Sequence, residues 1–188
     1  MRKVIISKSI LKLSEESKRK LKEFSKDTLE LAINNEKYVN VYRIIYLSRG
    51  LKIAGFVVEP KNKEGKLPCI IWNRGGSRGF GAIKIGNCYT NIANLARQGY
   101  IIFASQYSGG PGSEGIDDWG GRNIEDVLVL RKIIKQWPNA DYNSIGMMGW
   151  SRGGMMTYRA LSLVKWIKAA VIIAGPTDEV SAPKFRKG

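Results

Sequence analysis

Short, almost purely apolar runs alternate with helical patterns over most of this chain, and this alternation constrains the fold more than any other feature. The runs predict strands at 67–73, 101–105, 145–150 and 167–174. The segments between them predict helices at 87–98, 122–136 and 152–164. Strands that are apolar throughout, separated by helices, are typical of a mostly parallel sheet with helices on both faces. The predicted fold class is therefore α/β, with ligands beyond the carboxyl ends of the strands.

The first third of the chain predicts a different arrangement. Residues 14–31 have the pattern of a charged amphipathic helix, with Ser14 as its N-cap and acidic residues in its first turn. Residues 41–48 and 51–59 read as two strands joined at Arg49-Gly50. We expect this hairpin to form an antiparallel N-terminal strand pair beside the parallel strands.

The last predicted strand, 167–174, is as hydrophobic as a central strand, yet the sequence ends a few polar residues later. A strand of this kind at the end of a sheet would present an open edge, and natural proteins avoid such edges because they pair with other chains. We therefore expect a truncated fold that lacks its last strands.

Charge is the outlier of the composition: 31 Lys and Arg against 16 Asp and Glu, a net charge of +15. A strongly basic chain suggests nucleic acid or an anionic surface as partner. Here the basic residues are spread along the chain, and no basic stripe interleaved with aromatic residues occurs. We expect neither a nucleic-acid nor a membrane partner. The apolar runs are too short to cross a bilayer and no signal peptide is recognisable, which predicts a cytoplasmic protein.

The two cysteines, Cys69 and Cys88, do not form a C-x-x-C pair, and no cluster of metal-ligating residues surrounds either. Cys69 lies in a predicted strand, where a cysteine is most often a small buried apolar residue. We expect neither a metal nor a cofactor.

The pattern G-x-S-x-G occurs at 75–79, around Ser77, and at 149–153, around Ser151. Both copies follow an apolar strand, but only the second is followed at once by a helical pattern. A serine on a sharp strand-to-helix turn is the arrangement in which hydrolases present a nucleophile. The alternative is a tight glycine turn without chemical meaning. We favour Ser151 as the candidate nucleophile.

An oxyanion hole in this arrangement uses the backbone N–H that follows the nucleophile, here Arg152, and a second donor from the loop after an earlier strand. The loop at 73–76, with Arg74 and Gly75, occupies that place. The usual base that activates such a serine is histidine, and the chain contains none. The sequence therefore predicts half of an active site.

A rival motif, G-x-G-x-x-G at 110–115, follows a predicted strand. A dinucleotide fingerprint needs its third glycine inside the following helix. Here the helix is predicted to begin only near Arg122, and Pro111 removes a backbone donor. A loop bordering the catalytic mouth is the better interpretation.

Taken together, these motifs resemble the catalytic domain of the prolyl oligopeptidase (peptidase S9) family, within the α/β-hydrolase fold. The stretches that carry the resemblance are Asn73-Arg74-Gly75-Gly76, Gly112-Ser113-Glu114-Gly115, Trp119-Gly120-Gly121, Glu125-Asp126-Val127 and Gly149-Trp150-Ser151-Arg152-Gly153-Gly154-Met155-Met156. The resemblance implies Ser151 as nucleophile and the Arg152 N–H as one oxyanion donor. The second donor would be a tyrosine or the backbone before the paired glycines, a position held by Arg74.

In this family the acid and the histidine follow the elbow, beyond two further strands. Asp178 follows the last predicted strand, where some hydrolases, but not this family, place their acid. We divide the chain into an N-terminal helical segment, 1–36, and a partial α/β-hydrolase domain, 37–188.

The expected function is that of a serine hydrolase, a peptidase or esterase that cleaves a peptide or a small ester or amide through an acyl-enzyme. Without a histidine, we expect the chain alone to have negligible activity. The alternative is a non-catalytic binding or assembly module that pairs through its exposed edge strand with another copy or a missing C-terminal segment. Nucleic-acid binding driven by charge is a third hypothesis.

Overall fold

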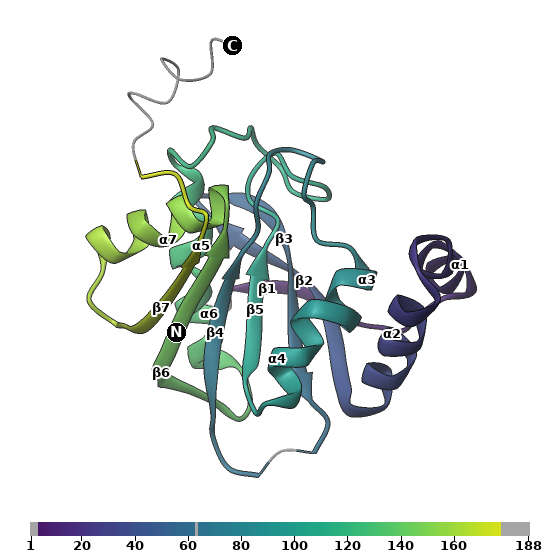
Figure 1. Ribbon diagram of the computed structural model, residues 1–188. Coiled ribbons are helices and arrows are strands. Elements are labelled where there is room, and N and C mark those ends of the chain that lie inside the picture. Colours follow the sequence, from purple (N-terminus) through teal and green to yellow (C-terminus); the bar gives the residue numbers. More distant parts are fainter. Residues whose placement is uncertain (1–3, 63, 178–188) are drawn as a thin grey trace.

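A seven-stranded mixed sheet forms the centre of the protein, in the strand order β1-β2-β3-β5-β4-β6-β7 (Figure 1). The computed structural model describes residues 4–62 and 64–177. The strands are β1 (Ile5–Leu11), β2 (Val39–Ser48), β3 (Leu51–Pro60), β4 (Leu67–Asn73), β5 (Ile101–Ser105), β6 (Ala140–Trp150) and β7 (Ile167–Ile173). The sheet pairs β1 with β2, β2 with β3 and β3 with β5 antiparallel, and all further neighbours parallel. The predicted α/β class, with an antiparallel N-terminal part, is confirmed.

The hairpin of β2 and β3 turns at Arg49 and Gly50, whose φ angles are +54° and +81°. Two consecutive residues with positive φ make the type of tight turn that matches the twist of the strands on either side. β1 was not predicted, since the N-terminal segment was expected to be helical. Five of its seven residues are exposed, so the strand lacks the apolar alternation that marks a half-buried strand.

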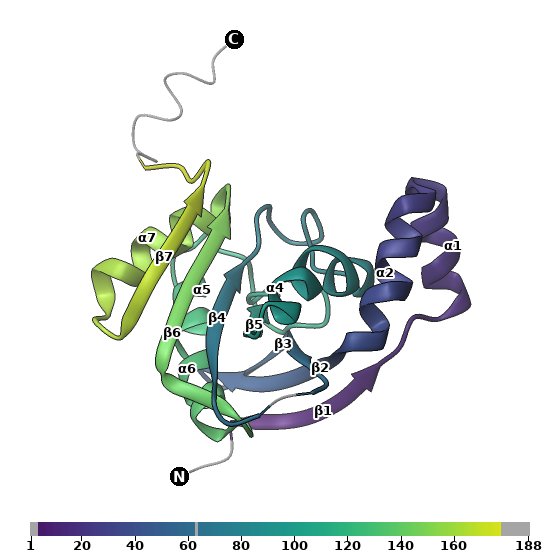
Figure 2. The same ribbon diagram turned by 60° about the horizontal axis from the view of Figure 1, so that its bottom comes forward.

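Helices cover the two faces of the sheet (Figures 1 and 2). α5 (Asn123–Leu128), α6 (Leu130–Gln136) and α7 (Arg152–Leu163) lie behind β4 and β6 in Figure 1 and pack on an apolar core with Ile71 and Met147. On the opposite face, a second core contains Ile102 and Tyr89. The elements of this side are α1 (Glu15–Phe24), α2 (Lys26–Tyr38), α3 (Ile85–Asn87), the π-helical turn η1 (Cys88–Ile92) and α4 (Ala93–Arg97).

Three predicted helices are interrupted. The helix predicted at 14–31 is two helices, because Ser25 between α1 and α2 adopts an extended conformation with φ −169°. Serine competes for backbone hydrogen bonds and so favours helix ends over helix interiors. The segment 122–136 is divided at Val129, and the segment 87–98 contains η1. The predicted N-cap is present, since the Ser14 hydroxyl accepts a hydrogen bond from the Ser17 N–H at 3.2 Å.

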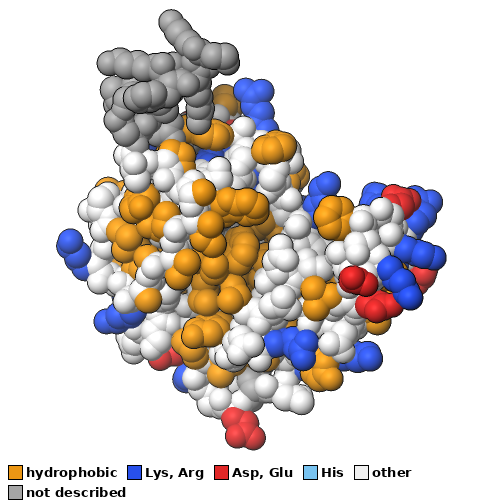
Figure 3. Space-filling model, viewed as in Figure 1, with side chains coloured by type: hydrophobic (Ala, Val, Ile, Leu, Met, Phe, Trp, Pro, Cys, Tyr) orange, Lys and Arg blue, Asp and Glu red, His pale blue; other side chains and the backbone are white. Residues whose placement is uncertain are grey.

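One part of the sheet is uncovered. In the described part of the chain, β7 is an edge strand, and most of its residues are exposed. Its pairing with β6 puts Val171 beside Met148 and Ile173 beside Trp150. Trp150 is 64% exposed, Val171 52% and Ile173 48%. Figure 3 shows the broad apolar surface that results over β4, β6 and β7. We call the side chains of Met148, Trp150, Ala169, Val171 and Ile173 the bare sheet face.

The described helices include none that is both long and apolar enough to cross a membrane.

Candidate functional site

Ser151 lies at the corner between β6 and α7, with φ +55° and ψ −126°. A positive φ is uncommon for any residue except glycine and costs free energy, which the surrounding structure must supply. Two hydrogen bonds hold the corner: the Ser151 N–H donates to the Ile173 carbonyl at 2.9 Å, and the Ser151 carbonyl accepts from the Gly154 N–H at 2.8 Å. Ser151 is nevertheless exposed. The sharp strand-to-helix turn expected at this residue is present.

Three glycines around Ser151 allow this turn to be so tight. A Cβ on Gly149 would overlap the Gly153 carbonyl, and a Cβ on Gly153 would overlap the Asn73 carbonyl. A Cβ on Gly154 would come within 2.6 Å of the Gly175 Cα. The first turn of α7 therefore packs backbone against backbone on the ends of its neighbouring strands, an approach that only glycine permits.

The loop after β4 lies directly beside the Ser151 corner. A Cβ built on Gly75 would lie 3.0 Å from the Trp150 carbonyl oxygen and 3.5 Å from the Ser151 Cβ. Ser151, Gly75 and Gly76 line a common cavity of about 450 Å³, which we call the Ser151 cavity. The loop predicted to complete the oxyanion hole is thus adjacent to Ser151.

Arg74 has a different part in this loop from the one its charge suggests. Its side chain is buried, and the guanidinium donates to the carbonyl oxygens of Gln106 at 2.9 Å, Arg78 at 3.1 Å and Phe80 at 3.2 Å. These bonds fix the loop from within. A donor to an oxyanion from this loop would therefore be a backbone N–H and not the Arg74 guanidinium.

Arg152, the first residue of α7, contributes to the corner through both backbone and side chain. Its N–H belongs to the first turn of a helix, where N–H groups have no acceptor within the helix. Its side chain is fully buried and forms two bonds to Asp117, Nη1 to Oδ2 at 2.8 Å and Nη2 to Oδ1 at 2.6 Å. It also donates to Asn123 Oδ1 at 2.8 Å and to the Gly76 carbonyl at 3.0 Å.

The Asp117 carboxyl group is held in its charged form. Burial alone would raise its pKa, but hydrogen bonds from Arg152 and from the backbone N–H groups of Arg78 and Trp119 outweigh burial and lower the pKa to about 2. Asp117 thus joins three segments: the loop after β4, its own loop and the start of α7.

Tyr107 lies between the two buried arginines. Its ring centroid is 4.9 Å from the Arg74 Cζ and 5.0 Å from the Arg152 Cζ, and its hydroxyl donates to the Arg74 carbonyl at 3.0 Å. The sequence analysis identified neither Tyr107 nor Asp117 nor Asn123 as part of the site. The one signal was their position near the loop at 110–115, which was expected to border the catalytic mouth.

The rival motifs form ordinary turns. Around Ser77, the Phe80 N–H donates to the Ser77 carbonyl, and no helix follows directly. In the G-x-G-x-x-G loop, the N–H groups of Gly110, Ser113 and Glu114 donate to carbonyl oxygens within the protein, so they are not directed at a phosphate. The following helix begins only at Asn123.

Cys69 and Cys88 are both buried and unpaired. Within residues 4–62 and 64–177, no group of three or more His, Cys, Asp or Glu side chains could hold a metal ion. Asp178, considered above as an acid, lies outside the described residues.

Comparison with known families agrees with this geometry. The model of the prolyl oligopeptidase family, Peptidase_S9, matches residues 87–185, which include the whole segment from η1 through the Ser151 corner. The chain belongs to the prolyl oligopeptidase family. The expected family and its α/β-hydrolase fold are therefore confirmed.

Individual relatives are peptidases by name. The chain is 33% identical over 138 residues to the Bacillus subtilis protein described as uncharacterized peptidase YtmA, which covers 69% of this chain and 52% of the relative. It is 33% identical over 117 residues to dipeptidyl-peptidase 5 of Porphyromonas gingivalis, covering 58% of this chain and 17% of the relative. This prolyl oligopeptidase family chain thus spans about half, or less, of the length of these relatives.

Solved structures show the same fold. The acylaminoacyl peptidase of Pyrococcus horikoshii superposes with a TM-score of 0.68 at 25% identity, over 83% of this chain and 26% of that protein. The rice cell wall degrading esterase LipA from Xanthomonas oryzae has a TM-score of 0.60 at 18% identity, over 92% of this chain and 50% of that protein, and shows the fold alone. The names of these relatives are those of peptidases and an esterase.

Proposed function

We propose that this chain carries the nucleophile half of a serine hydrolase site, in which Ser151 attacks the acyl carbon of an ester or amide. The observation that carries this proposal is the Ser151 corner. It combines a positive φ, an exposed side chain and a position at the mouth of a cavity beyond the carboxyl ends of β4 and β6. An ordinary glycine turn would not need a strained serine at its tip.

The chemistry assigns a role to each group. A base accepts the proton of the Ser151 hydroxyl as its Oγ bonds to the acyl carbon, and the former carbonyl oxygen takes up negative charge. The Arg152 N–H and a backbone N–H at Arg74 or Gly75 would stabilise that charge, because both segments adjoin Ser151. Collapse of the intermediate expels an alcohol or amine, which takes the proton back. Water then releases the acid from the acyl-enzyme by the same steps.

The base and its acid partner are proposed to lie outside these 188 residues, because the sequence contains no histidine. The members of such a triad act as a unit, so loss of the base alone removes most of the rate, on the order of a millionfold. The chain by itself should therefore have negligible hydrolase activity. The proposed substrate is a peptide or a small ester or amide, and the proposed location is cytoplasmic.

Labelling with an alkyl fluorophosphonate, followed by intact-mass measurement and peptide mapping, tests this proposal. We expect slow labelling, because no base activates the hydroxyl, and we expect the label on Ser151. Ser151→Ala should abolish it. Ser77→Ala, which changes the serine of the other G-x-S-x-G copy, is the matched control and should leave labelling unchanged.

Rapid labelling that Ser151→Ala removes would show that another base serves Ser151, and the claim of negligible activity would be wrong. Label on other residues with Ser151 unmodified would contradict the nucleophile assignment.

A second function, a non-catalytic assembly module, is favoured by a separate observation. β7 is an edge strand and the bare sheet face beside it is apolar and exposed. Exposed apolar patches of this kind, and open strand edges, are typical of surfaces that bind other protein.

A further inference from the structure

We propose that the substrate groove continues from the Ser151 cavity into a second cavity, walled by α1 and α2, which binds an uncharged apolar chain of the ester or amide. The assignment rests on the proposed function, because Ser151 defines where the reacting bond lies. The second cavity would select substrates by their apolar chain, through residues of the N-terminal helices that lie away from the reacting atoms.

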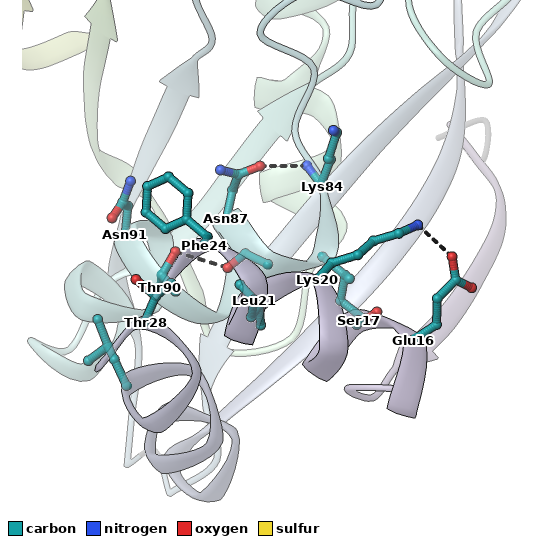
Figure 4. A pocket seen from close by; sticks show the side chains of 13 residues that line it. Glu16, Ser17, Lys20, Leu21, Phe24, Thr28, Lys84, Asn87, Thr90 and Asn91 are labelled. Carbon is teal, nitrogen blue, oxygen red and sulfur yellow. Dashed lines mark hydrogen bonds and ion pairs between the residues drawn. The ribbon is translucent and has the colours of Figure 1, made fainter. Parts of the chain in front are cut away.

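The second cavity has a volume of about 680 Å³, larger than that of the Ser151 cavity (Figure 4). This volume is in the range of sites that bind small molecules, which is about 300–1,000 Å³. We call it the helical cavity. Its walls come from α1, α2, α3 and η1, and it is lined by Glu16, Ser17, Lys20, Leu21, Phe24, Thr28, Leu31, Lys84, Ile85, Gly86, Asn87, Thr90 and Asn91.

The two cavities meet at Asn87 and Asn91, which line both of them. The Asn87 Oδ1 accepts a hydrogen bond from the Lys84 N–H at 2.8 Å, which orients this side chain. A chain that leaves the Ser151 cavity past these two amides would enter the helical cavity. The shared lining is the reason for assigning the helical cavity to the substrate.

Part of the lining of the helical cavity is apolar and could contact an apolar ligand. Phe24, at the end of α1, is 83% exposed and lines the same cavity as Asn87 and Asn91 (Figure 4). Leu21, Leu31 and Ile85 line the cavity with it. Leu21 also closes the junction between α1 and α3, since a Cβ on Gly86 would meet its Cδ2 at 3.0 Å. Burying these surfaces against a ligand is favourable by the hydrophobic effect.

The polar groups of the lining disfavour a positively charged occupant. The Glu16 carboxylate is paired with the Lys20 ammonium, so these charges balance each other (Figure 4). The Thr90 hydroxyl donates to the Gly86 carbonyl at 2.9 Å and is already satisfied. Thr28 and the two asparagine amides are neutral. Lys84 also lines the cavity and carries a positive charge, so a cationic chain would lose hydration here without gaining a partner of opposite charge.

The test measures binding of acetyl-, hexanoyl- and decanoyl-glycinamide to the full chain by isothermal titration calorimetry. Each methylene group that enters the helical cavity should raise affinity by about two- to fourfold. Thr28→Trp fills the cavity and Phe24→Ser removes its apolar wall, so both should abolish the gain from hexanoyl to decanoyl. Ile33→Ser is the matched control, because Ile33 is a partly exposed apolar residue of α2 outside the lining. It should keep the gain.

Circular dichroism and thermal unfolding establish that each variant is folded. Two results would overturn the proposal: affinity that does not depend on chain length, or a gain that survives both cavity variants and is lost in Val171→Lys. The latter would place the apolar chain on the bare sheet face.

A competition experiment links the two cavities. Decanoyl-glycinamide should slow fluorophosphonate labelling of Ser151 in the wild-type chain and in Ile33→Ser, but not in Thr28→Trp. Binding in the helical cavity without protection of Ser151 would overturn the groove. If Ser151 cannot be labelled at all while binding depends on Phe24 and Thr28, the proposed function fails and the apolar binding site stands.

Discussion

The guanidinium of Arg152 is fully buried, and the Asp117 carboxylate balances its charge through two hydrogen bonds. Burying a charge is costly unless it is paired and hydrogen-bonded, and both conditions hold here. The pair fastens the start of α7, where Ser151 and the Arg152 N–H lie, to the loop that contains Asp117. The precision of the Ser151 corner thus depends on a side chain distant from Ser151 in the sequence.

Replacing Asp117 by Asn should destabilise the protein strongly, because it leaves the Arg152 charge buried without a partner. The expected loss is about 3–5 kcal/mol in the free energy of unfolding. Urea unfolding at pH 7 measures it. Glu125→Gln, which breaks the exposed ion pair with Arg122, is the control and should cost about 0–1 kcal/mol. Equal losses of unfolding free energy in the two variants would contradict the claim that burial makes the Asp117–Arg152 pair important for stability.

The same pair predicts a dependence of stability on pH. The pKa of Asp117 is about 2 in the folded protein, below the value of about 3.9 for an unperturbed Asp. A lowered pKa stabilises the fold above pH 4, and this contribution, about 2–3 kcal/mol, is lost as the pH falls from 4 to 2. The stability difference between wild type and Asp117→Asn should therefore shrink across this range. A constant difference would show that protonation of Asp117 is not responsible.

At the scale of elements, the turn from β6 into α7 is a contact of backbone with backbone. Gly149, Gly153 and Gly154 remove the side chains that would separate α7 from β4 and from the end of β7. Because α7 begins so close to the ends of these strands, the N–H groups of its first turn lie beside the exposed Ser151. Glycine at these three positions is thus required by packing as well as by the conformation of the serine.

Gly153→Ala should destabilise the protein by about 1–3 kcal/mol or more, because its methyl group would overlap the Asn73 carbonyl. The matched control is Gly146→Ala in β6, where a Cβ would lie at an ordinary 3.5 Å from the Ala169 carbonyl oxygen. Thermal unfolding of both variants should show a clear loss only for Gly153→Ala. A similar melting temperature for both variants would mean that the backbone around Gly153 can shift to accommodate the added methyl group.

At the scale of the whole molecule, one region of the sheet has helices on both faces and another does not. β5, in the covered region, is buried throughout, whereas most of β7 is exposed. The bare sheet face and the unpaired edge of β7 lie together, so a partner that pairs with the edge would also cover apolar side chains. This is the surface on which the assembly hypothesis depends.

If that hypothesis is right, the chain should self-associate, with an average mass that rises with concentration in size-exclusion chromatography with light scattering. Val171→Lys puts a charge on the bare sheet face and should shift the protein toward the monomer. Ile116→Lys, at an exposed apolar residue of a loop, is the control and should not. A monomer at all concentrations in the wild-type chain would contradict self-association.

Much of the fold was accessible from local sequence patterns. The strands at 67–73 and 101–105 were predicted with the observed bounds, and so was the start of α7 at Arg152. The interruption at Ser25 and the strand β1 were missed, because a single serine and an exposed edge strand give weak periodic signals. Within the candidate site, the flanking glycines predicted the sharp turn that the structure has at Ser151. Asp117 was not, because nothing in its neighbourhood shows that it will meet an arginine 35 residues away.

The sequence by itself determined the succession of strands and helices and the glycine-rich corner at Ser151, because both depend on interactions between residues close together in the chain. Only the tertiary structure decided that β5 lies between β3 and β4, that Asp117 closes on Arg152, and that α1 and α2 wall a cavity that shares Asn87 and Asn91 with that of Ser151. These features arise from packing between distant segments. Such packing is set by the total apolar surface buried and by the hydrogen bonds satisfied, quantities that no local pattern contains.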